Sequence, residues 1–183
     1  MTTPPDYQAV LSFWFKELEP RAWWNSSPAL DTQIRERFGN TLKQAAASEL
    51  DAWRTNSQGR LAEILVLDQF SRHVYRGQSA AFAQDALALA LSQAAIAADA
   101  LEHLKEQERV FLLMPWMHSE SAAIHARAVA LFAAHTPATN LNYELRHKAI
   151  VDRFGRYPHR NAVLARTSSS EEIAFLREPG SSF

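Results

Sequence analysis

Glycine is scarce in this chain, which strongly limits the folds it can adopt. Only five glycines occur among 183 residues, and no Asn-Gly or Asp-Gly pair separates two alternating apolar segments. Tight β-hairpins depend on such pairs because their turns need positive φ. Alanine, leucine, glutamine and arginine are abundant, and all four favour helices. The sequence therefore predicts an all-α fold of about eight or nine helices.

Prolines and capping residues indicate where those helices begin and end. Pro4 and Pro5 are expected to open the first helix, Pro20 to end it, and Pro115 to interrupt a later one. Further helices are predicted over about residues 28–47, 57–76, 79–98, 106–114, 119–134 and 140–154, with a short piece at 50–54 and a last helix before Pro179-Gly180. The expected caps are Ser57 at an N-terminus, Gly77 and Gly155 as left-handed C-caps, and two overlapping capping boxes, Ser168-x-x-Glu171 and Ser169-x-x-Glu172.

Composition excludes several classes of protein. The absence of cysteine excludes disulfides, thiolate-bound zinc, iron–sulfur clusters and a cysteine nucleophile. Nineteen basic and twenty acidic side chains give a net charge of -1, so no overall field attracts nucleic acid. An apolar fraction of 47% is typical of a globular chain, and this length favours one domain over residues 1–183.

The start of the chain and its apolar runs bear on location. Residues 1–6 (MTTPPD) have neither a basic start nor an apolar stretch, so we expect no signal peptide. The longest strictly apolar run, residues 110–117 (VFLLMPWM), is far shorter than the ~20 residues that cross a bilayer. We therefore expect a cytoplasmic protein with no membrane partner.

The first of three polar segments lies in the helix predicted over residues 58–76. Asp68 and Arg72 fall in the middle of an apolar helical face that begins at Leu61. An unpaired buried charge costs several kcal/mol, so this carboxylate and guanidinium are expected to pair at their i, i+4 spacing. Either the pair only locks the helix to its neighbours, or Arg72, or Arg76 one turn further on, faces a binding cleft.

The second polar segment, residues 114–120 (MPWMHSE), ends an apolar run in His118-x-Glu120. A histidine beside a carboxylate and a hydroxyl is suited to proton transfer, so both residues are candidate catalytic groups. Two neighbouring ligands do not make a metal site, which needs three or four. In the structural alternative, Ser119 is an N-cap, Glu120 lies in the first turn of the next helix, and His118 is a hydrogen-bonded core residue.

The third polar segment, residues 147–161 (HKAIVDRFGRYPHRN), concentrates cations around a Gly/Pro turn. His147 shares a helical face with apolar residues and is expected to be partly buried, as a third candidate acid–base group. The turn contains Arg153, Arg156, His159 and Arg160. Such a cluster needs negative partners. These are either internal carboxylates, for which Asp68, Asp85, Glu120 and Asp152 are the candidates, or an anionic ligand.

Other site types find no support in the sequence. A di-iron helix bundle needs two Glu-x-x-His motifs, and Glu144-x-x-His147 supplies one. The chain contains no Gly-x-Gly-x-x-Gly fingerprint, phosphate-binding Walker loop or Gly-x-Ser-x-Gly elbow. No metal and no cofactor are therefore expected.

Three ordered motifs carry a resemblance to a known family. They are residues 67–72 (LDQFSR) with 75–77 and 81–85, then 114–120, then 153–161. With these motifs the chain resembles the bacterial family of domain of unknown function 924 over nearly its whole length, from residues 10–15, through 31–38, to 171–175 and the final Ser182-Phe183. The resemblance implies stacked antiparallel helix pairs of the tetratricopeptide-like superfamily, and it implies no particular activity.

Two positions depart from the pattern of that family. His73 stands where the family usually has asparagine, which adds an ionisable group beside Arg72. Ala165 stands where the family usually has glycine, and this residue suggests that the position does not need positive φ.

Three functions are weighed for this chain. The preferred hypothesis is a pocket between helices for a small anionic molecule, with Asp68 and the cationic residues Arg72, Arg76, Arg153, Arg156, His159 and Arg160 binding it and His118, Glu120 or His147 as candidate catalytic groups. An enzymatic role stays open. The second hypothesis is a tetratricopeptide-like scaffold that binds a protein or peptide through exposed aromatics such as Trp23, Trp24 and Trp53. In the third, the polar motifs form a purely structural core network.

Overall fold

The computed structural model describes residues 6–25 and 27–182, and all regular structure in these two ranges is helical. The all-α prediction is therefore confirmed. Pro4, Pro5 and Phe183, for which the sequence carried expectations, lie outside the described residues. The elements are α1 (Tyr7–Ser12), η1 (Phe13–Glu17), η2 (Pro20–Trp23), α2 (Pro28–Ala46), η3 (Asp51–Thr55), α3 (Ser57–Leu65), η4 (Val66–Phe70), α4 (Ser71–Val74), η5 (Ser79–Phe82), α5 (Asp85–Ala97), η6 (Ala100–His103), α6 (Glu106–Met117), α7 (Ala122–His135), α8 (Ala138–Phe154), η7 (Pro158–Arg160) and α9 (Ser170–Phe175).

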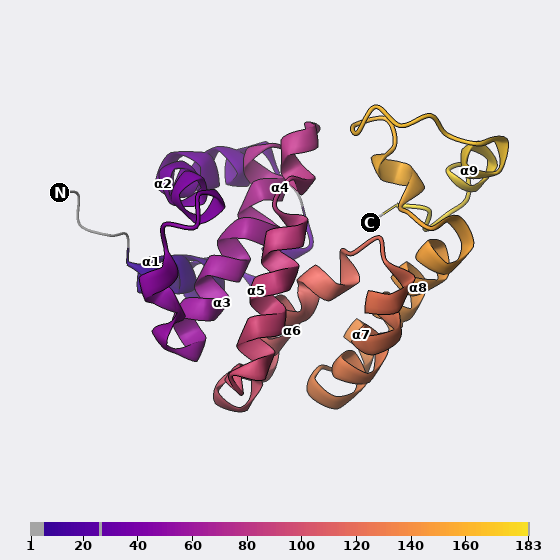
Figure 1. The fold of residues 1–183 in the computed structure, drawn as a ribbon. Helices are drawn as coiled ribbons and strands as arrows, with labels where there is room; N and C mark the ends of the chain where they lie inside the picture. The colour runs from indigo at the N-terminus through magenta and orange to yellow at the C-terminus, as the bar shows by residue number, and fades with distance from the viewer. Residues whose placement is uncertain (1–5, 26, 183) are drawn as a thin grey trace.

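The helices pack in an order that largely follows the chain (Figure 1). The long helix formed by α3, η4 and α4 lies centrally and contacts α1, α2, α5 and α6. α7 packs on α6 and α8 packs on α7, and the segment after α8 folds back across the end of this last pair. Residues from far apart in the chain therefore meet where α4, α5 and α6 face the segment after α8.

Two hydrophobic cores hold the described helices together. The main core runs from α1 to α7 and includes Trp14, whose ring centroid lies 5.6 Å from that of Phe70 and 5.5 Å from that of Phe111. A smaller core lies near the C-terminus and is formed by Ile150, Val151 and Tyr157, with Phe154 and Phe175 packed against it. The main core does not include the segment after α8. Polar contacts, among them those of Arg160 and Arg166, attach this segment to the other helices.

Some of the expected helix caps are confirmed. Gly155 closes α8 in the left-handed conformation at φ 69°, and Ser169 caps α9. The N-cap of α3, however, is Asn56 and not Ser57, because the side-chain amide oxygen Oδ1 of Asn56 accepts the backbone N–H of Gly59 at 2.9 Å. Asparagine is as good an N-cap as serine, and the helix therefore begins one residue earlier than a cap at Ser57 predicts.

Three helix boundaries differ from the sequence expectation. α6 does not stop at Pro115 but continues to Met117, since the surrounding side chains of this turn are buried in the core and compensate for one missing backbone hydrogen bond. The long central helix ends at Val74, and Gly77 takes φ 75° in the turn that follows. The segment expected as one helix over 79–98 is divided into η5 and α5 by a turn before Asp85.

A π-helical turn interrupts the long central helix at η4, between α3 and α4. Every residue of Val66–Phe70 is buried, including Asp68, which is 1% exposed. Single π-turns of this kind are uncommon and occur frequently at functional sites. The widened turn lies at the residues that the sequence analysis singled out, which directs attention to this part of the fold.

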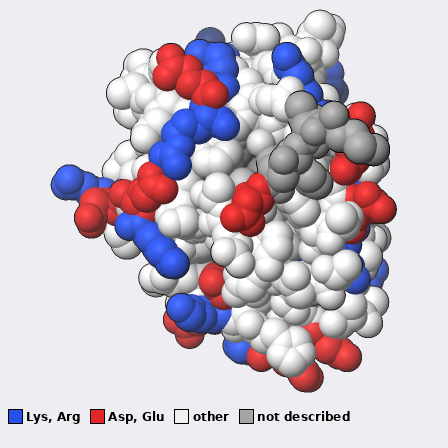
Figure 2. All heavy atoms as spheres, turned by 90° about the vertical axis from the view of Figure 1, so that its left-hand side faces the viewer, with Lys and Arg blue, Asp and Glu red and all other residues white. Residues whose placement is uncertain are grey.

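The surface shown in Figure 2 carries basic and acidic side chains that alternate, without a large area of one sign. One stretch, Ser79–Ala97, is long and apolar enough to cross a membrane by length and composition alone, and 22% of it is buried. The same stretch contains the turn between η5 and α5, and α5 packs against α3 and α6. Alanine supplies most of its apolar character, as in many core helices of globular chains.

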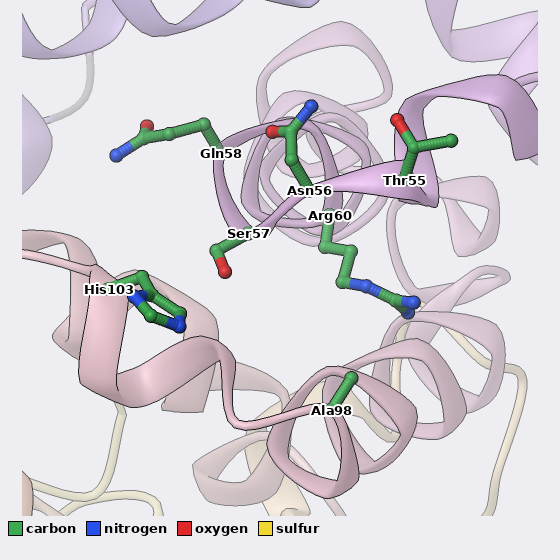
Figure 3. Close-up of a pocket in the computed structure, with 7 residues that line it drawn as sticks. All are labelled: Thr55, Asn56, Ser57, Gln58, Arg60, Ala98 and His103. Carbon is green, nitrogen blue, oxygen red and sulfur yellow. The ribbon is translucent and has the colours of Figure 1, made fainter.

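Two of the cavities that open on the surface of the described residues have the size of a small-molecule site. The larger, of about 450 Å³, lies between the start of α3 and the end of α5 (Figure 3). It is lined by Thr55, Asn56, Ser57, Gln58, Arg60, Ala98 and His103. The second, of about 390 Å³, lies beside η2 and the start of α2 and is lined by residues between Leu18 and Gln33. Neither cavity is lined by the candidate site residues of the sequence analysis.

Candidate functional site

The centre of the candidate site is Asp68, in the π-helical turn of the long central helix. Its carboxylate lies 3.4 Å from the guanidinium of Arg72, as the i, i+4 spacing predicts. Arg72 Nη1 also donates to the backbone carbonyl of Asp68 at 2.7 Å, and Gln69 Nε2 donates to the carboxylate at 2.6 Å. The local sequence thus brings a nearly fully buried carboxylate and a cation together within one turn.

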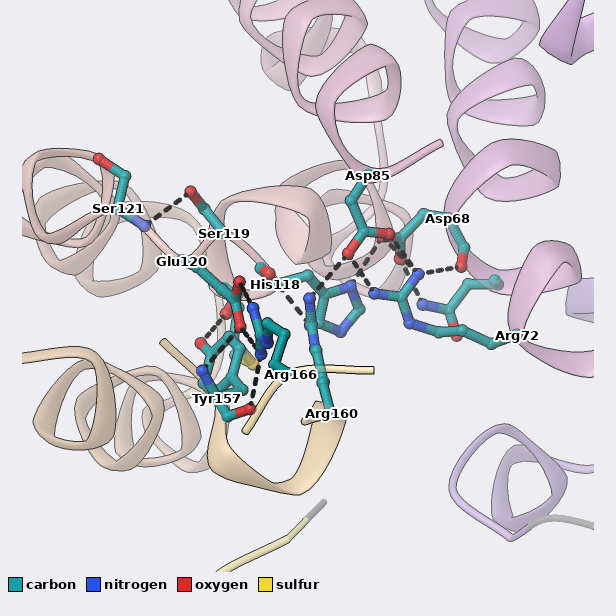
Figure 4. Close-up of polar contacts among 12 residues, drawn as sticks. Asp68, Arg72, Asp85, His118, Ser119, Glu120, Ser121, Tyr157, Arg160 and Arg166 are labelled. Carbon is teal, nitrogen blue, oxygen red and sulfur yellow. Dashed lines mark hydrogen bonds and ion pairs between the residues drawn. The ribbon is translucent and has the colours of Figure 1, made fainter. Parts of the chain in front are cut away.

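Asp85, the first residue of α5, joins two arginines from distant parts of the chain (Figure 4). Arg72 donates to both of its oxygens, at 2.9 and 3.0 Å, in a bidentate pair. Arg160, from η7, donates to one of the same oxygens at 3.1 Å. The carboxylate of Asp85 therefore ties the central helix, α5 and the segment after α8 to one point.

His118, the C-cap of α6, completes the cluster. Its Nδ1 lies 2.7 Å from an oxygen of Asp68, and its backbone carbonyl accepts from Arg160 Nη2 at 3.1 Å. Among the described residues, the other ring nitrogen, Nε2, has no hydrogen-bond partner, and the side chain is 12% exposed. A carboxylate that fixes one imidazole nitrogen and leaves the second free is the arrangement of a general acid–base dyad.

The protonation states of this dyad follow from its surroundings. Burial lowers the pKa of His118, and the positive charge of Arg72 lowers it further, so the imidazole is neutral near neutral pH. Burial opposes ionisation of Asp68, but His118 and Arg72 outweigh it and hold the pKa of that carboxyl well below its usual range. An ionised Asp68 accepts a hydrogen bond from Nδ1–H, and this fixes the tautomer in which Nε2 carries a lone pair.

Arg160 is held between two aromatic rings as well as by its hydrogen bonds. Its guanidinium carbon lies 4.6 Å from the centroid of Phe82 and 4.6 Å from that of Tyr157. The residue is 6% exposed, and burial lowers its pKa. Its Nε is a buried donor without a partner in the described residues. These contacts hold the guanidinium of Arg160 in place beside Asp85 and His118.

Glu120 belongs to an adjacent part of the network and does not touch His118. It pairs with both terminal nitrogens of Arg166, at 2.6 and 2.9 Å, and accepts the backbone N–H of Tyr157 at 2.7 Å. Ser119 is not an N-cap, because α7 begins at Ala122 after Ser121. Glu120 therefore anchors the segment after α8 to the loop between α6 and α7.

The third candidate acid–base group, His147, lies apart from the dyad. It is 7% exposed, its Nδ1 donates to the Tyr143 carbonyl at 2.8 Å, and burial lowers its pKa to about 3. Its ring packs edge-on against Tyr157, with centroids 5.7 Å apart. The His159 ring also packs against Tyr157, with ring centroids 5.6 Å apart, and burial lowers the pKa of His159 to about 4. Both imidazoles are therefore neutral packing groups around Tyr157.

A second buried carboxylate–histidine pair was not singled out by sequence analysis. His125 Nδ1 lies 2.6 Å from Glu144, and both side chains are fully buried. His125 Nε2 lies 2.8 Å from the Ser119 carbonyl, so it donates there, and one further proton is shared with Glu144. Burial raises the pKa of Glu144. Both nitrogens of His125 are engaged, so this pair is not arranged for acid–base work on a ligand.

Three predicted ligand-binding arginines are placed elsewhere. Arg76 does not pair with Asp68 but with Asp31 of α2, at 2.6 and 2.8 Å. Arg153 pairs with Glu171 at the exposed surface, and Arg156 with Glu172 at 2.6 and 2.8 Å. The predicted cation cluster is thus divided. Of its arginines, only Arg160 contacts Asp85 and His118, and together with Asp68 and Arg72 these three residues form what we call the central network.

Arg166 and Tyr157 contribute to the network without having been singled out by sequence. Asp85 was one of the carboxylates expected to pair with the cations of the third segment, and it pairs with Arg160. Asp85 carried a signal, since it is the first-turn carboxylate of an otherwise alanine-rich helix and lies in a family motif. Ala165, beside Arg166, takes φ 53°, so the expectation that this position needs no positive φ was wrong. In the described ranges, no group of three or more His, Asp or Glu side chains is placed to hold a metal ion.

Comparisons with known proteins agree with this architecture. A family model described as "Bacterial protein of unknown function (DUF924)" matches residues 10–180. A solved structure of a protein of unknown function from Agrobacterium tumefaciens is similar, with a TM-score of 0.89 and 34% sequence identity over 93% of this chain and 96% of that chain. A search of curated proteins found no match.

Proposed function

The chain belongs to the bacterial DUF924 family. For this chain we propose a function that rests on the geometry of the central network. Asp68, His118 and Arg72 form a binding site for a small anionic molecule, in which His118 acts as the acid–base group. The observation that carries the proposal is the His118 ring, which Asp68 holds by Nδ1 while Nε2 has no partner among the described residues.

The charges around His118 favour an anionic ligand. Arg72 has a 19% exposed side chain, and among the described residues its side-chain hydrogen bonds come only from its two terminal nitrogens. Its Nε therefore adds a donor on the same side chain. Arg72 and His118 contact the same Asp68 carboxylate. An anion bound to Arg72 therefore has the rest of its molecule close to the His118 ring.

A chemical test of the dyad uses the histidines of the chain as internal controls. Diethyl pyrocarbonate modifies neutral imidazoles that have an accessible nitrogen, and mass spectrometry of peptides locates each modified ring. We expect His118 to react, as exposed His103 does, and fully buried His125 to stay unmodified. An unreactive His118 beside a reactive His103 contradicts the proposal.

The anion itself is tested by thermal unfolding in phosphate, citrate or malonate at constant ionic strength. A ligand at one hundred times its Kd stabilises the folded protein by about 2.7 kcal/mol, which is a measurable shift in Tm. We expect the shift to be lost in Arg72→Gln and kept in Arg153→Gln, whose arginine pairs with Glu171 at the surface. An equal shift in both variants, or none in the unmodified protein, overturns the proposal.

His118→Asn separates function from structure. An asparagine amide can still donate to Asp68 but has no counterpart of Nε2, whereas His118→Gln places its amide nearer the Nε2 position. If His118 takes part in binding, His118→Asn weakens the protection by the anion. If the network is only structural, as the third hypothesis holds, the unmodified protein shows no such protection for the substitution to change.

A protein-binding scaffold is the other candidate function, and one side chain favours it. Trp24 is 56% exposed and stacks on Phe111 with ring centroids 5.9 Å apart. Trp53 is buried, and Trp23 is half-buried and donates its ring N–H to the Trp14 carbonyl. Pull-down with Trp24→Ala tests the scaffold.

We also propose, on the sequence arguments above, that the chain is a single domain of the tetratricopeptide-like superfamily. We propose a cytoplasmic location, without a membrane or nucleic-acid partner.

A further inference from the structure

The cavity between α3 and the end of α5 differs in chemistry from the central network. All but one of its lining residues are polar, the exception being Ala98, and no Asp or Glu is among the described residues that line it. The lining contains two hydroxyls, two amides, a guanidinium and an imidazole. A concave site with several side-chain donors and no carboxylate is suited to an anion.

Arg60 is the main reason to expect a ligand there. It is half-buried in the described structure, and its side chain makes neither an ion pair nor a hydrogen bond with any described residue. The arginines of the central network are each matched by a carboxylate, as Arg72 is by Asp85. A half-buried guanidinium facing a cavity without such a partner leaves its donors for a bound group.

Ser57 and His103 extend the set of free donors. Figure 3 shows the Ser57 hydroxyl on the side of the cavity where the His103 ring lies, whereas the Arg60 side chain extends to the opposite side in this view. Neither Ser57 nor His103 has a side-chain partner among the described residues. The two amides are already engaged: Asn56 accepts from Gly59, and Gln58 donates to Glu108 at 3.1 Å.

We propose that Arg60, Ser57 and His103 form a second ligand site, which binds the phosphate or carboxylate group of a small molecule. The cavity of about 450 Å³ is larger than one such group needs, so the remainder of the ligand lies along the neutral wall formed by Thr55, Gln58 and Ala98. This site is separate from the one at Arg72 and stands whether or not the proposed function holds.

Amide NMR tests the site residue by residue in the intact chain. Phenyl phosphate and benzoate are titrated separately at constant ionic strength, so that the two arms distinguish a phosphate from a carboxylate. We expect saturable shifts of the Ser57, Gln58 and His103 amides with one or both probes. In Arg60→Gln, the affinity falls at least about tenfold, because a charged hydrogen-bonded contact is lost.

Arg177→Gln is the matched control, since Arg177 is exposed and the substitution changes the net charge by the same amount. We expect it to keep the affinity of the unmodified protein. Dispersed spectra of both variants establish that they are folded. The absence of saturable shifts with either probe, or an equal affinity in Arg60→Gln and Arg177→Gln, overturns the proposal.

Discussion

Asp68 and His118 are fifty positions apart in the chain, yet an oxygen of one lies 2.7 Å from Nδ1 of the other. This contact joins the π-helical turn of the central helix to the C-terminus of α6. It is the contact on which the chemistry of the central network depends, because it decides which imidazole nitrogen is available.

The first prediction concerns the state of the His118 ring. Burial and Arg72 lower its pKa, and Asp68 holds the Nδ1–H tautomer. We expect nitrogen-detected NMR of the imidazole to show a neutral ring at pH 7, protonated at Nδ1, that titrates below pH 6.5. A ring that titrates above the free value, or is protonated at Nε2, contradicts the arrangement.

The second prediction concerns Asp85, which bridges Arg72 and Arg160. Asp85→Asn leaves two guanidinium groups close together without their shared carboxylate. Removing one partner of a fully buried pair costs 3–5 kcal/mol, and we expect about 2 kcal/mol here because Asp85 is 17% exposed. Urea unfolding measures the change.

Asp152→Asn is the control for that measurement. Asp152 pairs with Lys148 at i, i+4 on the surface, with a 45% exposed side chain, so its loss should change stability by no more than about 0.5 kcal/mol. Equal effects of the two substitutions would mean that the Asp85 bridge adds nothing beyond a surface pair.

The third prediction compares two left-handed residues. Ala165 takes φ 53°, which costs an L-residue about 1 kcal/mol, so Ala165→Gly should stabilise the protein by up to that amount. Gly155 takes φ 69°, which an alanine adopts only with strain, so Gly155→Ala should destabilise the protein by a similar amount. No atom lies within 4 Å of where the Cβ would be, so a steric clash adds nothing to this cost. Thermal unfolding of both variants checks the opposite signs.

The fourth prediction uses two helical glycines. A Cβ at Gly59 would lie 2.0 Å from the backbone oxygen of Trp53, so Gly59→Ala should cost about 3 kcal/mol or more. A Cβ at Gly39 in α2 meets nothing within 4 Å, so Gly39→Ala should stabilise the protein by about 0.5–1 kcal/mol. Denaturation midpoints that rise for both variants would show that α3 and η3 can separate without penalty.

The fifth prediction concerns acid stability. Burial lowers the pKa of His147 to about 3, while the unfolded chain has its ordinary value near 6.5. Below about pH 6.5 the unfolded state binds a proton that the folded state does not, so stability present above that pH is lost as the pH falls toward 3. The slope for one such group is about 1.4 kcal/mol per pH unit.

Urea unfolding between pH 7 and pH 4 tests this in His147→Asn, whose amide can still donate to the Tyr143 carbonyl. We expect the slope to fall by about one proton. The charges of His118, His125 and His159 also lower the pKa of His147, and these three side chains are present in the variant as in the unmodified protein. An unchanged slope in His147→Asn assigns the acid sensitivity to those other groups.

The local part of this architecture was predictable from sequence. The Asp68–Arg72 pair follows from i, i+4 spacing on an apolar face, and the cap at Gly155 follows from the need for positive φ. Helical periodicity gives the face on which a residue lies but not the residue it meets. The Asp68–His118 and Asp85–Arg160 contacts span 50 and 75 positions, so only the packed structure shows them.

The same limit explains why the partners of the other arginines were not predicted. Arg76, one turn beyond Arg72, was a candidate to face a binding cleft, and α2 supplies Asp31 as its partner. Arg153 and Arg156 find Glu171 and Glu172, because α9 folds back over the turn after α8. Pro115 continues a helix since burial of its neighbours outweighs one lost hydrogen bond.

The π-helical turn at Val66–Phe70 makes the central helix sensitive to length in a way that substitutions do not probe. Such a turn accommodates one residue more than an α-helical turn, and each residue rotates the helix by about 100°. Deleting a single residue here would redirect Arg72, His73 and Arg76 together, away from Asp85 and Asp31. The register of one turn thus sets two separate groups of ion pairs, so a single insertion or deletion in this segment would break both.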